Sequence, residues 1–139
     1  MKFDFLSKEA MNQNSIIVFV CEHGAAKSVI AAAYFNKLAR EKGLNVQGVA
    51  RGTNPDQTLS PQAVKGLRED GLSPGESVPQ KLSVADVEAA QRIITFCQLP
   101  VEFQGKAIIE CWEGVPPVSD DYEKARDAII EQIGHLINK

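Results

Sequence analysis

Residues 16–28 read IIVFVCEHGAAKS and join a strand signal directly to a loop and a helix start. The first five of them form an unbroken β-branched and aromatic run, which is typical of a strand buried on both faces of a parallel sheet. Residues 26–42 carry apolar side chains at helical spacing and are followed by Gly43, a common helix stop. A strand, a tight loop and a helix in this order predict an α/β fold that begins here.

The rest of the chain continues the alternation of strands and helices. Further strands are predicted at residues 46–50, 92–96 and 107–112. Helices are predicted to begin at Ser60-Pro61, at Ser83 and at Asp120, and the last of these has Glu123 three residues on as a capping-box partner. Four strands separated by helices predict a parallel sheet whose ligand site lies at the carboxyl ends of the strands.

Length and composition indicate one globular domain. The 139 residues fit a single domain over residues 16–139, preceded by a polar N-terminal extension over residues 1–15. No secretory signal and no membrane-length apolar run is apparent, so we expect a cytoplasmic protein without a membrane partner. The formal net charge of -3, with scattered Lys and Arg, argues against nucleic acid as a partner. The three cysteines are not spaced as a zinc site, so we expect free thiols and no metal.

The loop between the first strand and the first helix has the composition of an anion site. Small side chains at its centre leave successive N–H groups able to turn toward one point, beside the positive end of the helix. In that field Cys21 is expected to be a thiolate nucleophile, and the Ser28 hydroxyl could donate a hydrogen bond to it. The residues expected to hold a phosphate-like oxyanion are Glu22, His23, Gly24, Ala25, Ala26, Lys27 and Ser28.

The same residues fit two other interpretations of this loop less well. A lone cysteine at a strand end is usually a small core side chain and a lone lysine at a helix start is usually solvated, but their combination with the small-residue turn favours a site. A nucleotide-binding P-loop also ends in Lys-Ser. Cys21 and Ala26, however, stand where that motif requires glycines.

With these residues the chain resembles the low-molecular-weight protein tyrosine phosphatases and the thioredoxin-coupled arsenate reductases that share their fold. The family loop is Cys, five residues, Arg, Ser, and the chain also has a Gly52-Thr53 turn and Trp112 shortly before a proline. The resemblance implies a three-layer α/β/α fold with a four-stranded parallel sheet in the order 2-1-3-4. It also implies a Cys21 nucleophile that forms a cysteinyl-phosphate or cysteinyl-arsenate on a backbone cradle, with no cofactor.

The chain departs from the family pattern at two positions. Lys27 replaces the loop arginine, and a point charge cannot grip an oxyanion in the bidentate way of a guanidinium, so slow turnover is expected. Pro116 stands where the family carries its general-acid aspartate. Asp120 or Asp121 could supply the acid, although Asp120 is more simply a helix cap. Arg51 could supply the guanidinium or be a solvated turn residue.

Three functions remain open. The first is a cysteine-dependent phosphatase acting on a phosphomonoester, with phosphotyrosine in a protein as the substrate that the resemblance suggests. The second is an arsenate reductase that uses Cys21 with Cys97, which follows the third strand as in the reductases, and that has thioredoxin as its partner. The third is an oxyanion-binding module without turnover. Cys97 could instead be a packing residue, a packing role is expected for Cys111, and a structural role is expected for His135.

Overall fold

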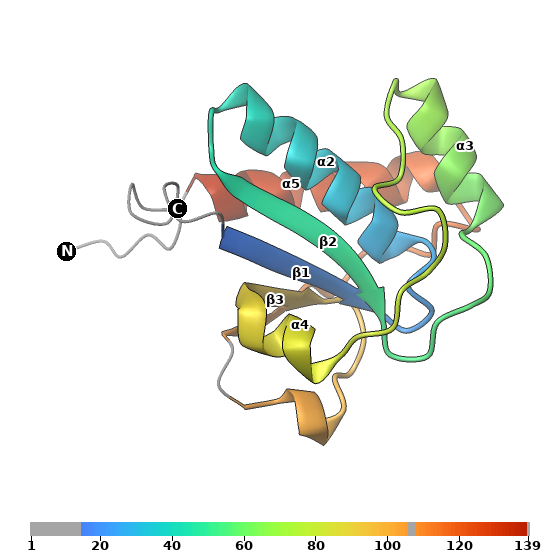
Figure 1. Cartoon of the computed structure of the whole chain (residues 1–139). Coiled ribbons are helices and arrows are strands. Elements are labelled where there is room, and N and C mark those ends of the chain that lie inside the picture. Colours follow the sequence, from blue (N-terminus) through green and yellow to red (C-terminus); the bar gives the residue numbers. More distant parts are fainter. Residues whose placement is uncertain (1–14, 106–107, 139) are drawn as a thin grey trace.

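The computed structural model describes residues 15–105 and 108–138 and contains one four-stranded parallel sheet (Figure 1). The strands, in the spatial order β2-β1-β3-β4, are β2 (Val46–Gly52), β1 (Ser15–Cys21), β3 (Ala90–Thr95) and β4 (Ile109–Cys111). The helical elements are α2 (Lys27–Glu41), α3 (Pro61–Glu69), α4 (Val84–Ala89), the short 3₁₀ helix η1 (Val101–Phe103) and α5 (Tyr122–Ile137). The predicted α/β fold and the strand order 2-1-3-4 are confirmed.

Helices lie on both faces of the sheet. Figure 1 shows α2 and α5 on one side, with α3 beside them, and the short α4 on the other. Along β1, Ile17 and Phe19 join the larger apolar cluster under α2 and α5, whereas Val18 and Val20 join a smaller cluster on the α4 side. The central strand is therefore buried on both faces, as its continuous apolar run predicted, and it holds Cys21 on a rigid support.

Several predicted strand boundaries shift by a few residues. β2 continues to Gly52 because it stays paired with β1 through the last register pair, Cys21 with Gly52. β3 starts at Ala90, which pairs with the beginning of β1. β4 is shorter than the predicted 107–112, since it has a single neighbour, and Ala107 lies outside the described residues. The predicted N-terminal extension also lies outside them, except for Ser15, which begins β1.

Two helix caps match the sequence prediction and one does not. Ser60 caps α3 by accepting a hydrogen bond from the Ala63 N–H, and Ser83 forms a capping box with Asp86 at α4. The predicted cap of the last helix at Asp120 is wrong. Residues 118–120 form a turn that delays the helix by one residue, and the Asp121 side chain accepts from the Lys124 N–H at 3.1 Å.

One carboxylate joins three helices on the far side of the core from α4. Asp70, which directly follows α3, accepts hydrogen bonds from the hydroxyls of Tyr34 on α2 and Tyr122 on α5, and from the Arg126 guanidinium. Burial alone would raise the pKa of Asp70, but these three donors lower it below its ordinary value. Burial and the bond to Asp70 raise the pKa of Tyr34 to about 12. Tyr122 therefore packs in this cluster, and it is absent from the lining of the pocket around Cys21.

Among the described residues, no helix is both long enough and apolar enough to span a bilayer.

Candidate active site

The predicted anion loop lies at the carboxyl edge of the sheet, where β1 ends and α2 begins. Cys21 is the last residue of β1 and is buried, and Lys27 is the first residue of α2. The N-terminal turn of this helix, with its free N–H groups and positive dipole end, therefore closes one side of the loop. The structure thus brings together the residues that the sequence selected, in the position expected for a ligand site of an open α/β sheet.

A second segment, residues 53–60, fixes the direction of the loop's peptide groups. Its N–H groups donate to the loop carbonyls of Cys21 (3.3 Å), Glu22 (2.7 Å), His23 (3.0 Å) and Ala25 (2.9 Å). Because the N–H and C=O of one peptide group point in opposite directions, carbonyls turned toward this segment leave the loop N–H groups turned away from it. Within the described part of the chain, no backbone carbonyl accepts from the N–H groups of residues 22–27. The loop therefore presents a set of unused donors, which is what an oxyanion requires.

A close contact between two glycines holds the loop against the end of β2. Gly24 has φ +62°, in the left-handed region that glycine tolerates, and a Cβ placed on it would lie 2.8 Å from the Gly52 N atom. A Cβ on Gly52 would in turn lie 2.7 Å from the Gly24 N atom. Both positions therefore require glycine. The Gly52-Thr53 pair noted in the sequence is thus the surface on which the loop is packed.

The thiol of Cys21 has a hydroxyl partner. The Cys21 Sγ and Ser28 Oγ atoms lie 3.0 Å apart, and the Ser28 side chain is fully buried. A serine hydroxyl can donate a hydrogen bond to a thiolate, which stabilises the charged form of the sulfur. This is the contact predicted from the sequence.

Lys27 lines the pocket, but its ammonium group is shared with another segment. Its Nζ donates to the backbone carbonyl of Val115, in the loop after β4, at 2.9 Å. An arginine has five donors and could keep such a bond while still contacting an anion with two others, whereas a lysine has three donors at a single point. The lysine therefore ties the anion loop to the segment that carries Pro116.

The pocket around Cys21 has a volume of about 500 Å³ and includes residues that the sequence did not select. Besides the loop, its walls come from the segment after β2, from the end of β3 and from the loop before α5. The side chains from these three segments are Asp56, Thr58, Leu59, Ser60, Pro61, Phe96, Cys97, Val118 and Ser119. Asp56 is the one carboxylate among them, and no pattern in its own stretch of sequence distinguished it.

Cys97 lies in the same pocket as Cys21, and Cys111 does not. Burial raises the pKa of the Cys97 thiol, the nearby Cys21 and Glu22 raise it further, and hydrogen bonds from Thr95 and Thr53 partly oppose the increase. Cys111 is exposed on the edge strand β4, so the packing role predicted for it is wrong. His135 is exposed on α5. None of the three cysteines forms a disulfide in this structure.

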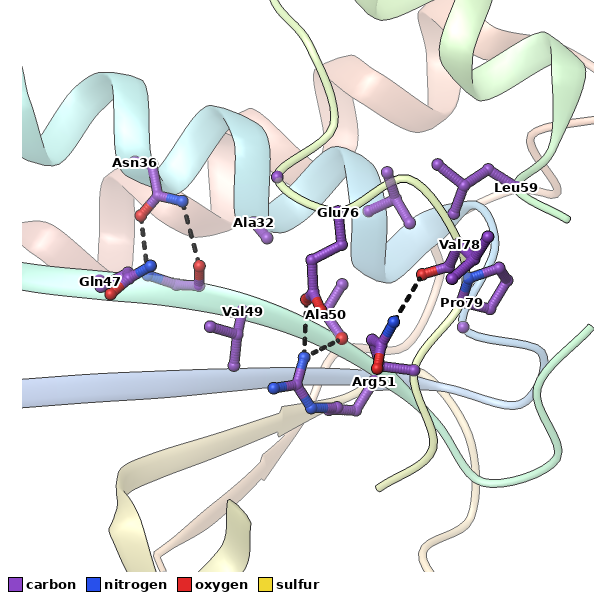
Figure 2. A pocket seen from close by; sticks show the side chains of 15 residues that line it. Ala32, Asn36, Gln47, Val49, Ala50, Arg51, Leu59, Glu76, Val78 and Pro79 are labelled. Carbon is purple, nitrogen blue, oxygen red and sulfur yellow. Dashed lines mark hydrogen bonds and ion pairs between the residues drawn. The ribbon is translucent and has the colours of Figure 1, made fainter. Parts of the chain in front are cut away.

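The two aspartates predicted as possible general acids, and the arginine predicted as a possible anion ligand, do not line this pocket. Asp120 is exposed, Asp121 caps α5, and neither lines the pocket. Arg51 is neither a loop ligand nor a solvated turn residue, because it belongs to β2 and forms ion pairs with Glu76 (2.8 Å) and Asp86 (3.1 Å). Figure 2 shows its guanidinium beside Glu76 in a separate cavity of about 290 Å³ over β2. A catalytic role for either aspartate stays a prediction.

Within residues 15–105 and 108–138, no group of three or more His, Cys, Asp or Glu side chains is placed to hold a metal ion. A thiol, a hydroxyl and an ammonium group surround a set of unused N–H donors, and this combination suits nucleophilic attack on a bound tetrahedral oxyanion.

Comparison with protein families agrees with this chemistry. The family model described as low molecular weight phosphotyrosine protein phosphatase matches residues 16–104, which is more than half of the chain. The match begins with β1 and includes the anion loop and Cys97. No curated protein matches the sequence.

Solved structures with the same fold include both phosphatases and arsenate reductases. A low molecular weight protein tyrosine phosphatase from Bacillus subtilis has a TM-score of 0.75 at 21% identity, with 88% of this chain and 95% of that chain covered. An arsenate reductase from Archaeoglobus fulgidus has a TM-score of 0.70 at 24% identity, with 88% and 99% covered. A YwlE mutant from Bacillus subtilis has a TM-score of 0.76 at 21% identity, with 89% and 97% covered. At identities below 25%, the similarity to these structures establishes the fold alone.

Proposed function

Since the chain belongs to the low molecular weight phosphotyrosine protein phosphatase family, we propose that it is a cysteine-dependent phosphatase that hydrolyses phosphomonoesters through Cys21. In the first step the Cys21 thiolate attacks phosphorus and the ester oxygen leaves. In the second step water attacks the cysteinyl-phosphate, which releases phosphate and regenerates the thiolate. A phosphorylated protein side chain, with phosphotyrosine as the family substrate, is the proposed physiological ester.

The observation that carries this proposal is the orientation of the anion loop. Four of its carbonyls are bonded to residues 53–60, so its N–H groups are held in place without a partner before any ligand arrives. Hydrogen-bond donors that are already in place stabilise the transition state strongly, because they need no reorganisation when charge moves onto the equatorial oxygens of the phosphate. The Cys21–Ser28 contact places the nucleophile at the beginning of the same loop.

Replacement of Lys27 by arginine is expected to raise the turnover of an aryl phosphate about tenfold, because one added charge-assisted hydrogen bond in the transition state is worth about 1.4 kcal/mol or more. Steady-state kinetics between pH 5 and 8, with phosphate binding measured in parallel, would test this. Lys37→Arg, the same exchange on the exposed part of α2, is the control. Phosphate binding without turnover in both wild type and Lys27→Arg would refute the phosphatase and favour an oxyanion-binding module.

The second candidate is an arsenate reductase, and the observation that favours it is the position of Cys97 in the pocket of Cys21. Cys21 would attack arsenate with loss of water. The Cys97 thiolate would then attack Cys21 sulfur, so that two electrons pass to arsenic, arsenite leaves and a Cys21–Cys97 disulfide forms. A dithiol partner such as thioredoxin would reduce that disulfide. The raised pKa of the Cys97 thiol disfavours its thiolate, and we therefore place this function second.

Under the proposed phosphatase function, arsenate is expected to cause no consumption of a dithiol reductant. The measurement is the arsenate-dependent loss of free thiol from a defined reductant, followed with wild type and with single cysteine variants. Consumption that disappears in both Cys21→Ser and Cys97→Ser but persists in Cys111→Ser would establish the reductase instead. Cys111 is the matched control, since it is exposed on β4 outside the pocket.

A further inference from the structure

A histidine and an aspartate form a pair at the mouth of the Cys21 pocket. The Nδ1 atom of His23 lies 3.3 Å from Asp56 Oδ1 and 3.3 Å from the Asn54 carbonyl oxygen. The Asp56 N–H also donates to the His23 carbonyl at 3.0 Å, so backbone and side chain both hold the two residues together. Both side chains are about half exposed and both line the pocket. The pair thus faces the solvent side of the site.

The contacts determine which nitrogen of His23 can exchange a proton with a ligand. Nδ1 faces two acceptors, the Asp56 carboxylate and the Asn54 carbonyl, so it carries a hydrogen. Nε2 is then the atom that can gain or lose a proton, as in other sites where a carboxylate fixes the tautomer of an imidazole. The Glu22 carboxylate, 3.9 Å from Nε2, is the second negative group that flanks the ring.

Hydrolysis of an unactivated phosphomonoester needs a proton donor at this mouth. The leaving oxygen lies opposite the attacking sulfur, and therefore on the outer side of a phosphate held in the loop. The titratable side chains that line the pocket are Cys21, Glu22, His23, Lys27, Asp56 and Cys97. Cys21 is the nucleophile, Lys27 is bonded to Val115, and burial makes the Cys97 thiol a weak acid. Of the remaining three, Glu22 and Asp56 are carboxylates, and histidine is the residue type that exchanges protons near neutral pH.

We propose that His23 is the general acid and base of this site and that Asp56 is its positioning residue, an inference that rests on the proposed phosphatase function. As Cys21 sulfur bonds to phosphorus and the ester P–O bond breaks, His23 Nε2 gives its proton to the leaving oxygen. His23 then takes a proton from the water that attacks phosphorus, the S–P bond breaks, and phosphate and the Cys21 thiolate are released. The His23–Asp56 pair thus supplies the proton that Pro116, at the position of the family's general-acid aspartate, cannot supply.

Substrates with different leaving groups separate this role from a structural one. A dinitrophenolate leaving group departs without a proton, whereas an alkoxide needs one. His23→Gln is therefore expected to lower kcat/KM for an alkyl phosphate about a hundredfold and to change it less than about threefold for dinitrophenyl phosphate. His135→Gln, the same exchange at the exposed histidine of α5, is the matched control and should change neither.

The Asp56→Asn variant provides a second, independent test. It should show the same dependence on leaving group to a smaller extent. Equal losses for both substrates, in His23→Gln or in Asp56→Asn, would overturn the role of His23 while leaving the phosphatase in place. Absence of turnover by wild type on both substrates would instead overturn the proposed function itself.

Discussion

Replacement of Cys21 by serine is expected to abolish phosphatase turnover, by at least about a thousandfold, while phosphate binding persists. A neutral hydroxyl is a far poorer nucleophile than a thiolate, and removal of a covalent nucleophile ranks among the largest single losses known in enzymes. The loop donors are main-chain N–H groups fixed by residues 53–60, so the substitution leaves them unchanged. Aryl phosphate kinetics and the phosphate-dependent rise in Tm measure the two effects separately.

Cys111→Ser controls for general effects of removing a thiol, because Cys111 is exposed on β4 and does not line the pocket. Residual turnover in Cys21→Ser above about a tenth of the wild-type rate would mean that another group attacks phosphorus. Loss of phosphate binding together with turnover would mean that the thiolate itself is needed to organise the loop, and the assignment of Cys21 as a nucleophile would lose its support.

Replacement of Gly52 by alanine is expected to lower the free energy of unfolding by about 1–3 kcal/mol and to abolish phosphate binding. The added Cβ would lie within 2.9 Å of three main-chain atoms in the anion loop, the Gly24 N and Cα atoms and the His23 carbonyl carbon. Main chain cannot swing aside as a flexible side chain can. The loop must therefore move away from β2, and its carbonyls then lose the bonds that aim the N–H groups.

Urea unfolding and phosphate titration of Gly52→Ala measure this prediction. Gly75→Ala is the matched control, because a Cβ at Gly75 meets nothing within 4 Å. A Gly52→Ala protein that binds phosphate with wild-type affinity would show that the loop does not depend on its contact with β2. The orientation argument for the anion site would then need another basis.

The sequence predicted the fold and the centre of the site because both depend on local signals. The apolar run before Cys21 defined a strand buried on both faces, and the small residues after it defined a loop that enters a helix. A one-residue error at the last helix, Asp121 instead of Asp120 as its cap, arose because two adjacent aspartates offer the same capping chemistry. The tertiary course of the turn at residues 118–120 decides between them.

The rest of the site could not be predicted because it depends on how distant segments meet. Asp56 reaches the pocket only because residues 53–60 lie along the anion loop, and the bond from Lys27 joins residues 88 positions apart. Arg51 directly follows a predicted strand, and its ion-pair partners Glu76 and Asp86 lie 25 and 35 positions away in the sequence. Such partners have no signature in the composition or periodicity of either segment.

Four bonds between main-chain atoms turn the carbonyls of the anion loop toward residues 53–60, and this separates binding of the anion from choice of the ester. Because these bonds come from main-chain N–H groups, the exposed positions 54, 57 and 58 can change identity while the cradle is kept. Residue 58 also lines the pocket. Related chains can therefore acquire new substrates, and engineered variants can be given them, by substitutions in a segment that leaves the nucleophile and its anion cradle intact.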